Sequence, residues 1–215
     1  MEPSRHPQAH HPQASYSLEE AGAPADPVTL FARWMDDVVD AGLPEPTAMV
    51  LATVSPAGRP RARTVLLKDY GAAGFVFYTN RRSAKGRALA ERPQACLVFP
   101  WHPIQRQVII EGPVRALSTS ESEPYFHSRP RGSQLGAWAS RQSSVLASRA
   151  ELEARYQELE ARWPEGTTVP TPEFWGGYRV LPEVMEFWAG RPSRLHDRLR
   201  YRRAGQDWVL ERLAP

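Results

Sequence analysis

The sequence predicts a mainly β protein with flanking helices, of the α+β class, built around an antiparallel barrel. Two groups of short segments are rich in β-branched and aromatic residues, which is typical of strands. Most neighbouring segments are joined by turns too short for a crossover helix, so antiparallel hairpins are expected. The helical segments are grouped outside the strands instead of alternating with them, which disfavours a βαβ fold.

Residues 1–25 are rich in Pro, Ala, His and Gln without a periodic apolar pattern, which predicts a mobile tail. A helix is expected next, because Asp26 is a good N-cap and Pro27 suits the first helical position. Apolar residues then recur at helical spacing until Gly42 ends the helix: Phe31, Trp34, Met35 and Val38. Residues 26–215 are expected to form a single domain.

From Thr47 the apolar pattern changes to that of extended chain. Five strands are predicted, at residues 47–54, 61–69, 75–79, 95–101 and 107–117. Turn-like segments at 55–58 and 70–74 separate the first three strands, and a short helix at about 83–91 separates the third from the fourth.

A helical section follows these strands. Ser120 and Glu123 predict a capping box, and Ser148 and Glu151 predict a second one, which opens an amphipathic helix that ends near Trp163. Four more strands are predicted after this helix, at residues 177–181, 184–188, 199–203 and 208–212.

The composition is that of an ordinary globular protein. Hydrophobic residues make up 41% and charged residues 24%, which excludes general disorder, and a net charge of +3 is small for a nucleic-acid-coating protein. The lone Cys96 excludes a disulfide framework and a multi-cysteine metal site. The longest apolar run is too short for a membrane span, and no apolar secretory signal is apparent, so we expect a cytoplasmic location.

Two segments contain the only lysines of the chain. Alternation along the strand at 63–68 places Arg63 and Lys68 on opposite faces, where they could serve two different anions or lie in water. Segment 78–86 runs from a strand end into a helix start and offers free N–H groups, a hydroxyl and Lys85, which is favourable for a phosphate. The alternative for the second segment is plain N-capping by Ser83.

Two further segments contain clustered cations. Tyr125, Arg129 and Ser133 could converge on one phosphate or form a surface arginine cluster. If the chain is extended after residue 193, Arg194 and His196 project from one side together with Arg198, while Leu195 turns toward apolar packing. A metal site at His196 lacks companion ligands, and no serine lies in a nucleophile elbow. Together the four segments suggest a protein that binds two phosphorylated, aromatic small molecules.

Several strings, in order along the chain, resemble those of the pyridoxine/pyridoxamine 5′-phosphate oxidase family. They are RTVLLK, FVFYTN, FPWHPIQRQV, EGPV, YFHSRPRGSQLGAW, SRQSS, FWGGYRV, EFW, RLHDR and the terminal ERLAP. The resemblance implies a homodimeric split β-barrel that binds FMN in two clefts at the subunit interface. It also implies oxidation of pyridoxamine or pyridoxine 5′-phosphate to pyridoxal 5′-phosphate. Oxygen would reoxidise the flavin and give hydrogen peroxide, and the amine substrate would release ammonia.

The resemblance also implies which residues bind each molecule. The cofactor-binding set is Arg63, Thr64, Val65, Leu66, Leu67, Lys68, Tyr78, Thr79, Ala84, Lys85, Gln107, Gln142, Ser143, Trp188 and Arg198. The substrate-binding set is Lys68, Tyr125, Arg129, Ser133, Arg194 and His196, and the last two are the expected catalytic residues.

The chain departs from the family pattern in two places. Ala84 stands where a second basic residue is common, and Arg81 or Arg82 could compensate for it. Of the family's lid segment, residues 13–16 retain only Tyr16.

Two other functions compete with this interpretation. A binder of another flavin, a deazaflavin or haem would share the fold but would not need the substrate-side residues. A nucleic-acid binder would fit the isoelectric point near 9.2, but the basic residues are scattered and nearly balanced by acidic ones.

Overall fold

The computed structural model describes residues 17–215, and residues 1–16 lie outside this description. The helices are α1 (Pro27–Asp40), α2 (Ala84–Glu91), α3 (Thr119–Ser128), α4 (Arg131–Ala139) and α5 (Arg149–Arg162). The strands are β1 (Ala48–Val54), β2 (Pro60–Leu66), β3 (Asp69–Gly71), β4 (Gly74–Asn80), β5 (Gln94–Trp101), β6 (Arg106–Ala116), β7 (Trp175–Val180), β8 (Val184–Ala189), β9 (Asp197–Ala204) and β10 (Asp207–Arg212).

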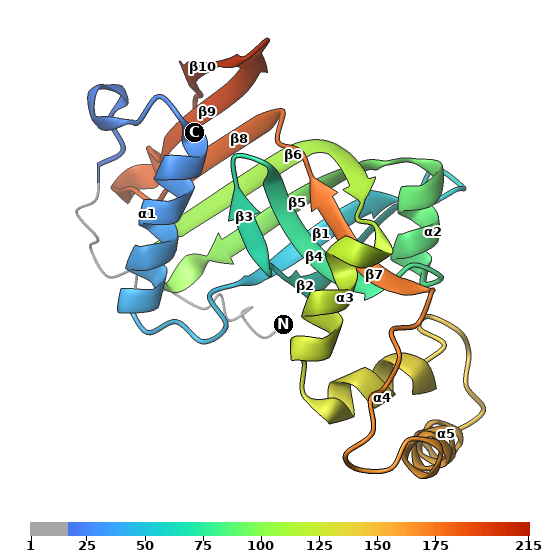
Figure 1. The fold of residues 1–215 in the computed structure, drawn as a ribbon. Coiled ribbons are helices and arrows are strands. Elements are labelled where there is room, and N and C mark those ends of the chain that lie inside the picture. Colours follow the sequence, from blue (N-terminus) through green and yellow to red (C-terminus); the bar gives the residue numbers. More distant parts are fainter. Residues whose placement is uncertain (1–16) are drawn as a thin grey trace, which may run out of the picture.

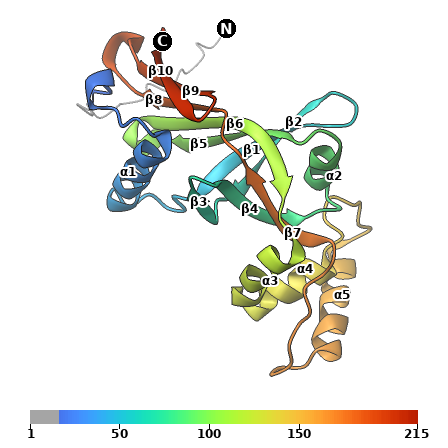
Figure 2. The same ribbon diagram turned by 45° about the horizontal axis from the view of Figure 1, so that its top comes forward.

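The strands form a curled antiparallel sheet with helices around it, which confirms the expected fold class (Figure 1). The order along the main path is β10-β9-β8-β6-β5-β1-β2. The long strand β6 pairs with β5 and β8 along its first part and with β7 at its end, and β7 continues the sheet to β4. The curvature of β6 between these neighbours is visible in Figure 2.

Gly112 lies at the point where β6 changes partners. A Cβ atom there would lie 1.9 Å from the carbonyl oxygen of Leu181, so only glycine allows the chain after β7 to approach this closely.

Helix α1 closes one side of the barrel, as expected from its sequence. Asp26 accepts a hydrogen bond from the N–H of Val28 (3.1 Å), and Gly42 has a φ of +68° just beyond the helix. Phe31 and Trp34 are fully buried, and the Phe31 ring lies 5.0 Å from the Phe75 ring in an edge-on contact.

Helices α3, α4 and α5 form a separate group beyond β7 (Figures 1 and 2). Phe126, Leu135, Val169 and Trp175 form a second, smaller core there. Helix α5 has no buried residue, and its amphipathic character is limited to half-buried side chains such as Tyr156 and Leu159 that pack against this core.

Several predicted boundaries are wrong. The capping box at the start of α3 consists of Ser118 and Glu121, two residues before the predicted pair. At α5, Ser148 caps the helix, but the Glu151 carboxylate accepts from the N–H of Ala147, so the predicted box is incomplete.

The strand predicted at 61–69 is divided into β2 and β3. The N–H of Leu67 still donates to Thr47 beside β1, whereas the N–H of Lys68 donates to Val76 of β4. The chain changes partners between these residues.

Ordered packing begins before residue 26. Leu18 is buried, and the Tyr201 hydroxyl donates to the carbonyl oxygen of Pro24 (2.9 Å). The expected tail is therefore wrong for residues 17–25, whereas residues 1–16, including segment 13–16 with Tyr16, lie outside the described residues. Within residues 17–215, no helix is long and apolar enough to cross a membrane.

Candidate functional site

The first group of site residues surrounds Lys85 at the start of α2. Its ammonium donates to Gln142 Oε1 (2.8 Å) and to Thr79 Oγ1 (3.2 Å). The N–H of Ala84 donates to Ser143 Oγ (3.1 Å). The end of β4, the start of α2 and the loop after α4 thus converge, as the resemblance implies. Ser83 also caps α2, so the capping alternative holds beside this cluster.

The electrostatics of this first group favour an anion. Burial lowers the pKa of Lys85, and the nearby charge of Arg63 lowers it further. Burial also lowers the pKa of Arg63, whose guanidinium donates to Thr53 Oγ1 (2.7 Å) and to the Leu51 carbonyl (3.1 Å). Within residues 17–215, neither cation forms an ion pair with a carboxylate. A phosphate between these cations would relieve their repulsion.

Arg81 and Arg82 do not supply the charge that Ala84 lacks. The Arg81 guanidinium donates to the carbonyl oxygen of Leu117 and packs against Gly176. The Arg82 guanidinium lies over the Phe174 ring, 5.2 Å from its centre. The contacts of these two arginines therefore do not favour the possible compensation for Ala84.

The second group lies on β4, β7 and the region from α3 to the start of α4. The rings of Tyr78 and Tyr125 stack with centres 4.2 Å apart, and Trp175 stacks on Tyr78 at 5.2 Å. The Arg129 guanidinium lies 5.0 Å from the Trp175 ring, and its Nη2 donates to the carbonyl oxygen of Ser133 (2.8 Å).

Arg129 also has an unused donor. Its Nη1 atom is buried without a hydrogen-bond partner among the described residues, and burial lowers the pKa of Arg129. A buried guanidinium N–H without a partner is costly, and an anionic ligand would satisfy it. Lys68, the other expected phosphate ligand, is exposed beyond the end of β2.

The third group is a row across three strands. Gln107 of β6 is paired with Trp188 of β8, which is paired with Arg198 of β9. The His196 ring lies 4.7 Å from the Trp188 ring. Arg198 forms an ion pair with Glu186 (2.8 Å), and this hydrogen bond raises its pKa.

The predicted extended conformation around Arg194 is wrong. Residues 192–194 form a short 3-10 helix, and both Ser193 and Arg194 have positive φ angles of 59° and 61°. Strand alternation therefore does not apply, and Leu195, which was expected to pack, is 68% exposed.

The three groups do not form one closed site within a single chain. Arg63 is on β2 and Trp188 is on β8, and β1, β5 and β6 lie between them. The outer face of the intervening strands carries a stripe of half-buried apolar residues. The stripe consists of Val50, Val98 and Ile109, which are cross-strand neighbours on β1, β5 and β6.

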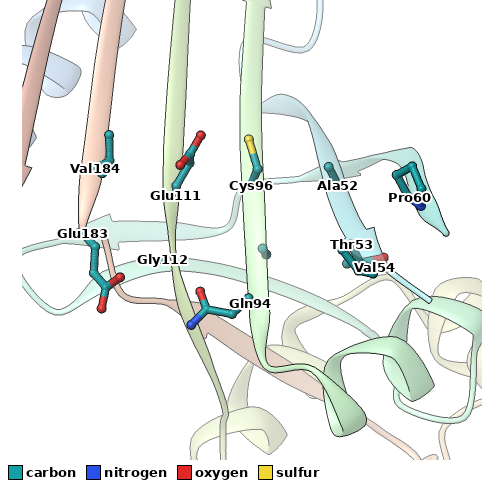
Figure 3. A pocket seen from close by; sticks show the side chains of 11 residues that line it. Ala52, Thr53, Val54, Pro60, Gln94, Cys96, Glu111, Gly112, Glu183 and Val184 are labelled. Atoms are coloured by element: carbon teal, nitrogen blue, oxygen red, sulfur yellow. The ribbon is translucent and has the colours of Figure 1, made fainter. Parts of the chain in front are cut away.

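A hollow of about 350 Å³ lies near this stripe (Figure 3). Its lining includes Cys96, Glu111 and Glu183, and none of the expected site residues. Burial and the neighbouring Glu111 raise the pKa of Cys96 to about 11, so its thiol is a poor nucleophile. The lining of this hollow therefore offers no activated thiol for covalent chemistry.

Comparison with known proteins identifies the family. The model for the family described as pyridoxamine 5′-phosphate oxidase matches residues 35–163. The chain belongs to this family. A second model, described as the pyridoxine 5′-phosphate oxidase C-terminal dimerisation region, matches residues 175–215.

Individual relatives agree with this family assignment. A pyridoxine/pyridoxamine 5′-phosphate oxidase from Thermosynechococcus vestitus is 59% identical over 198 residues, which cover 92% of this chain and 93% of the relative. One from Salinispora arenicola is 55% identical, covering 94% and 92%. Among solved structures, PhzG from Burkholderia lata in complex with tetrahydrophenazine-1-carboxylic acid has a TM-score of 0.86 and 35% identity, covering 93% of this chain and 98% of that one. An FMN-binding protein from Nostoc punctiforme (TM-score 0.69, 18% identity, coverage 90% and 98%) shares the fold.

Trp175 belongs to the second group by its contacts, but it was not among the residues predicted from the sequence. It lies within the FWGG string of the oxidase resemblance, but only the structure shows that its ring supports Tyr78 and Arg129 together. The sequence alone shows only a tryptophan at the start of a buried strand, and this does not predict its contacts with Tyr78 and Arg129.

Proposed function

We propose that this chain is an FMN-dependent oxidase that converts pyridoxamine and pyridoxine 5′-phosphates to pyridoxal 5′-phosphate. The observation that carries the proposal is a pair of separate groups of cationic and hydroxyl side chains, joined by one strand. Thr79 of β4 contacts Lys85 of the first site, and the preceding Tyr78 stacks on Tyr125 of the second. A phosphorylated cofactor and a phosphorylated substrate need two such sites. Relatives with this activity, at 55–59% identity, support the same substrates.

Lys85 and Arg63 would bind the phosphate of FMN, and Thr79, Gln142 and Ser143 would orient the cofactor beside them. Bound FMN supplies a hydride acceptor that oxygen restores, with hydrogen peroxide as product. Arg129 and Tyr125 would hold the substrate phosphate, together with Lys68 and Ser133.

The loop with Arg194 and His196 would orient the substrate ring. For the amine substrate, water enters and ammonia leaves as the aldehyde forms. The protein's own contribution is thus binding and orientation of the two molecules.

The test of the activity is a turnover assay on the purified protein. We expect a yellow protein that oxidises both phosphorylated substrates, with hydrogen peroxide and the aldehyde formed in equal amounts. A yellow protein that forms neither product would instead support a flavin-binding protein with another substrate.

We propose that a second copy of the chain completes each site. The dimerisation region at residues 175–215 and the apolar stripe between the groups support a homodimer, with FMN bound between the first group of one subunit and the third group of its partner. Residues 26–215 would act as one domain, because β6 pairs both with β5, which precedes the helical group, and with β8, which follows it. We also propose a cytoplasmic location, in line with a single cysteine that forms no disulfide framework.

Mixing two variants tests this shared site, at an FMN concentration at which each variant alone is inactive. Lys85→Ala removes the first group and Trp188→Ala removes the third, so a mixed dimer has one site with both defects and one intact site. After subunit exchange we expect about a quarter of wild-type activity, since half of the dimers are mixed and half of their sites are intact. Failure to recover activity in a mixture shown to exchange subunits would mean that each chain builds its own site.

Ala84→Arg is expected to tighten FMN binding about tenfold, because a charged hydrogen bond to a phosphate contributes roughly 1.5–3 kcal/mol. Arg81 is engaged with Leu117, so position 84 adds no further cation to the pair of Lys85 and Arg63. Fluorescence titration of the flavin measures the change, and Ala84→Gln controls for side-chain size. An arginine variant that binds FMN no better than the glutamine variant would contradict the idea of a missing charge.

A further inference from the structure

The loop between β8 and β9 has an unfavourable backbone conformation. Ser193 and Arg194 both lie in the left-handed region, with φ angles of 59° and 61°, which residues with a Cβ atom rarely adopt. Two consecutive residues of this kind persist only where surrounding contacts hold the chain. The contacts of this loop are therefore informative about how Arg194 and His196 are placed.

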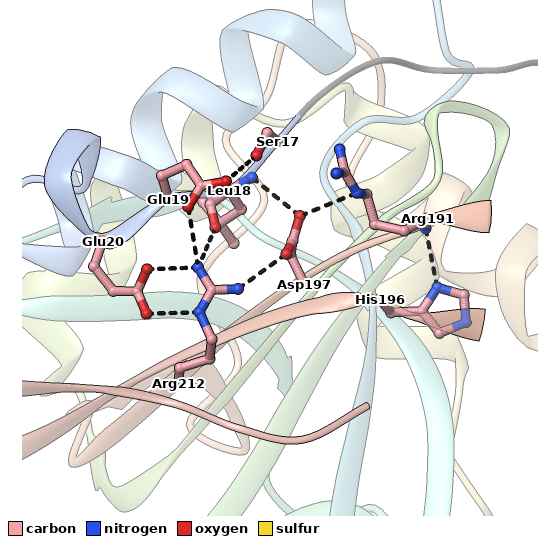
Figure 4. A network of polar contacts seen from close by, with 8 residues as sticks. All are labelled: Ser17, Leu18, Glu19, Glu20, Arg191, His196, Asp197 and Arg212. Atoms are coloured by element: carbon pink, nitrogen blue, oxygen red, sulfur yellow. Dashed lines mark hydrogen bonds and ion pairs between the residues drawn. The ribbon is translucent and has the colours of Figure 1, made fainter. Parts of the chain in front are cut away.

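Arg191 closes the loop on itself (Figure 4). Its backbone N–H donates to Nδ1 of His196 (3.0 Å), and its guanidinium Nε lies 3.6 Å from Asp197 Oδ2. Because Nδ1 accepts this hydrogen bond, the neutral His196 ring carries its proton on Nε2 and presents a donor there. The contact thus fixes both the ring position and its tautomer.

Asp197 joins this loop to two other parts of the fold. Its side chain is only 14% exposed, and Oδ1 accepts from Arg212 of β10 at 2.9 Å. Oδ2 accepts from the N–H of Leu18 at 3.3 Å. Arg212 is held in turn by an ion pair with Glu20 (2.6 Å). Figure 4 shows the carboxylate between these groups.

We infer that Asp197 is a positioning residue for the oxidation, because its carboxylate holds Arg191 and Arg212 and thereby maintains the strained loop that presents Arg194 and the Nε2 donor of His196. This inference rests on the proposed function. Asp197 itself is directed toward Arg191, Arg212 and Leu18, and it acts only through the loop.

The variant that tests this role is Asp197→Asn, which keeps the size of the side chain and removes its charge. With FMN bound, we expect kcat to fall about tenfold, since small misplacements of orienting groups are costly. The KM should change less than about threefold, because Arg129 still anchors the substrate phosphate. The FMN dissociation constant should also stay within about twofold of wild type, because the first group is untouched and Arg198 of the third group keeps its ion pair with Glu186.

Glu211→Gln is the matched control. It makes the same chemical change in the same pair of strands and breaks the ion pairs with Arg200 (2.7 Å) and Arg202 (3.3 Å), but it does not touch the loop. We expect wild-type kcat for this variant. Equal losses in both variants would mean that ion pairs of the β9–β10 ribbon act through stability alone, and would overturn the proposal.

Ser193→Gly provides a rescue. Glycine adopts positive φ angles without steric cost, so in the Asp197→Asn background it should restore part of the lost kcat. A further fall in kcat would contradict a role for Asp197 in holding this backbone.

Nitrogen NMR of the histidine ring adds a readout that does not depend on activity. In wild type and Glu211→Gln we expect His196 Nδ1 to be an acceptor and Nε2 to carry the proton, and in Asp197→Asn we expect a mixture of tautomers. An unchanged His196 spectrum in Asp197→Asn would overturn the inference. If the wild type lacks turnover while the spectra differ as expected, the proposed function fails and the positioning contact stands.

Discussion

Lys85→Ala is expected to weaken FMN binding by roughly ten- to hundredfold, because charged hydrogen bonds contribute roughly 1.5–3 kcal/mol. Lys68→Ala should leave FMN bound and raise the KM for the phosphorylated substrate. The reason is their different settings: Lys85 is half-buried beside Thr79 and Gln142, whereas Lys68 is exposed after β2. Flavin fluorescence and steady-state kinetics measure the two effects. Equal loss of flavin from both variants, with normal KM, would refute two separate phosphate sites.

The pH dependence of FMN binding gives a second check on Lys85. Burial and Arg63 lower the pKa of Lys85, so the free protein loses this proton at a lower pH than an exposed lysine would. The phosphate binds the charged form, and FMN affinity should therefore fall as the pH rises through the lowered pKa. Lys85→Arg keeps its charge throughout and should lose this alkaline decline. Identical profiles for wild type and Lys85→Arg would assign the decline to another group.

Arg129→Lys is expected to raise the KM for the substrate about a hundredfold while FMN stays bound. The guanidinium donates to Ser133 through Nη2 and still has the buried, partnerless Nη1, and its plane packs against Trp175. A lysine cannot make these contacts at once, because its ammonium is a single point charge.

Arg131→Lys is the control for Arg129→Lys. Arg131 lies two residues along and donates to the carbonyl oxygens of Thr167 (2.8 Å) and Pro164 (2.9 Å), which secure the chain after α5. We expect a lower melting temperature and an unchanged KM. If both variants raised the KM equally, Arg129 would be acting through the fold of the helical group.

Local signals in the sequence predicted much of the fold. Asp26, Pro27 and Gly42 mark α1 correctly, because capping and left-handed residues act through nearest neighbours. The break between β2 and β3 was missed because it depends on two hydrogen bonds to distant strands, from Leu67 to Thr47 and from Lys68 to Val76. No pattern within residues 61–69 contains that information.

The candidate site likewise has one part that local sequence predicts and another part that only the fold reveals. Lys85 and Arg129 stand out in the sequence as cations among hydroxyl and aromatic residues, whereas the row of Gln107, Trp188 and Arg198 depends on the register of three strands. The conformation at Ser193 and Arg194 could not be predicted, because neither residue is of a type that favours a positive φ.

The shared pairing of β6 has a consequence for biosynthesis of the protein. Its partner strands β7 and β8 come late in the chain, so both remain unavailable until residues 175–189 have been synthesised. Until then the edge of β6 that will pair with β7 and β8 is an open hydrogen-bonding edge, to which other chains can add. A nascent or truncated chain that stops near residue 163 would present this edge to its neighbours, and the last strands thus protect the first ones from aggregation.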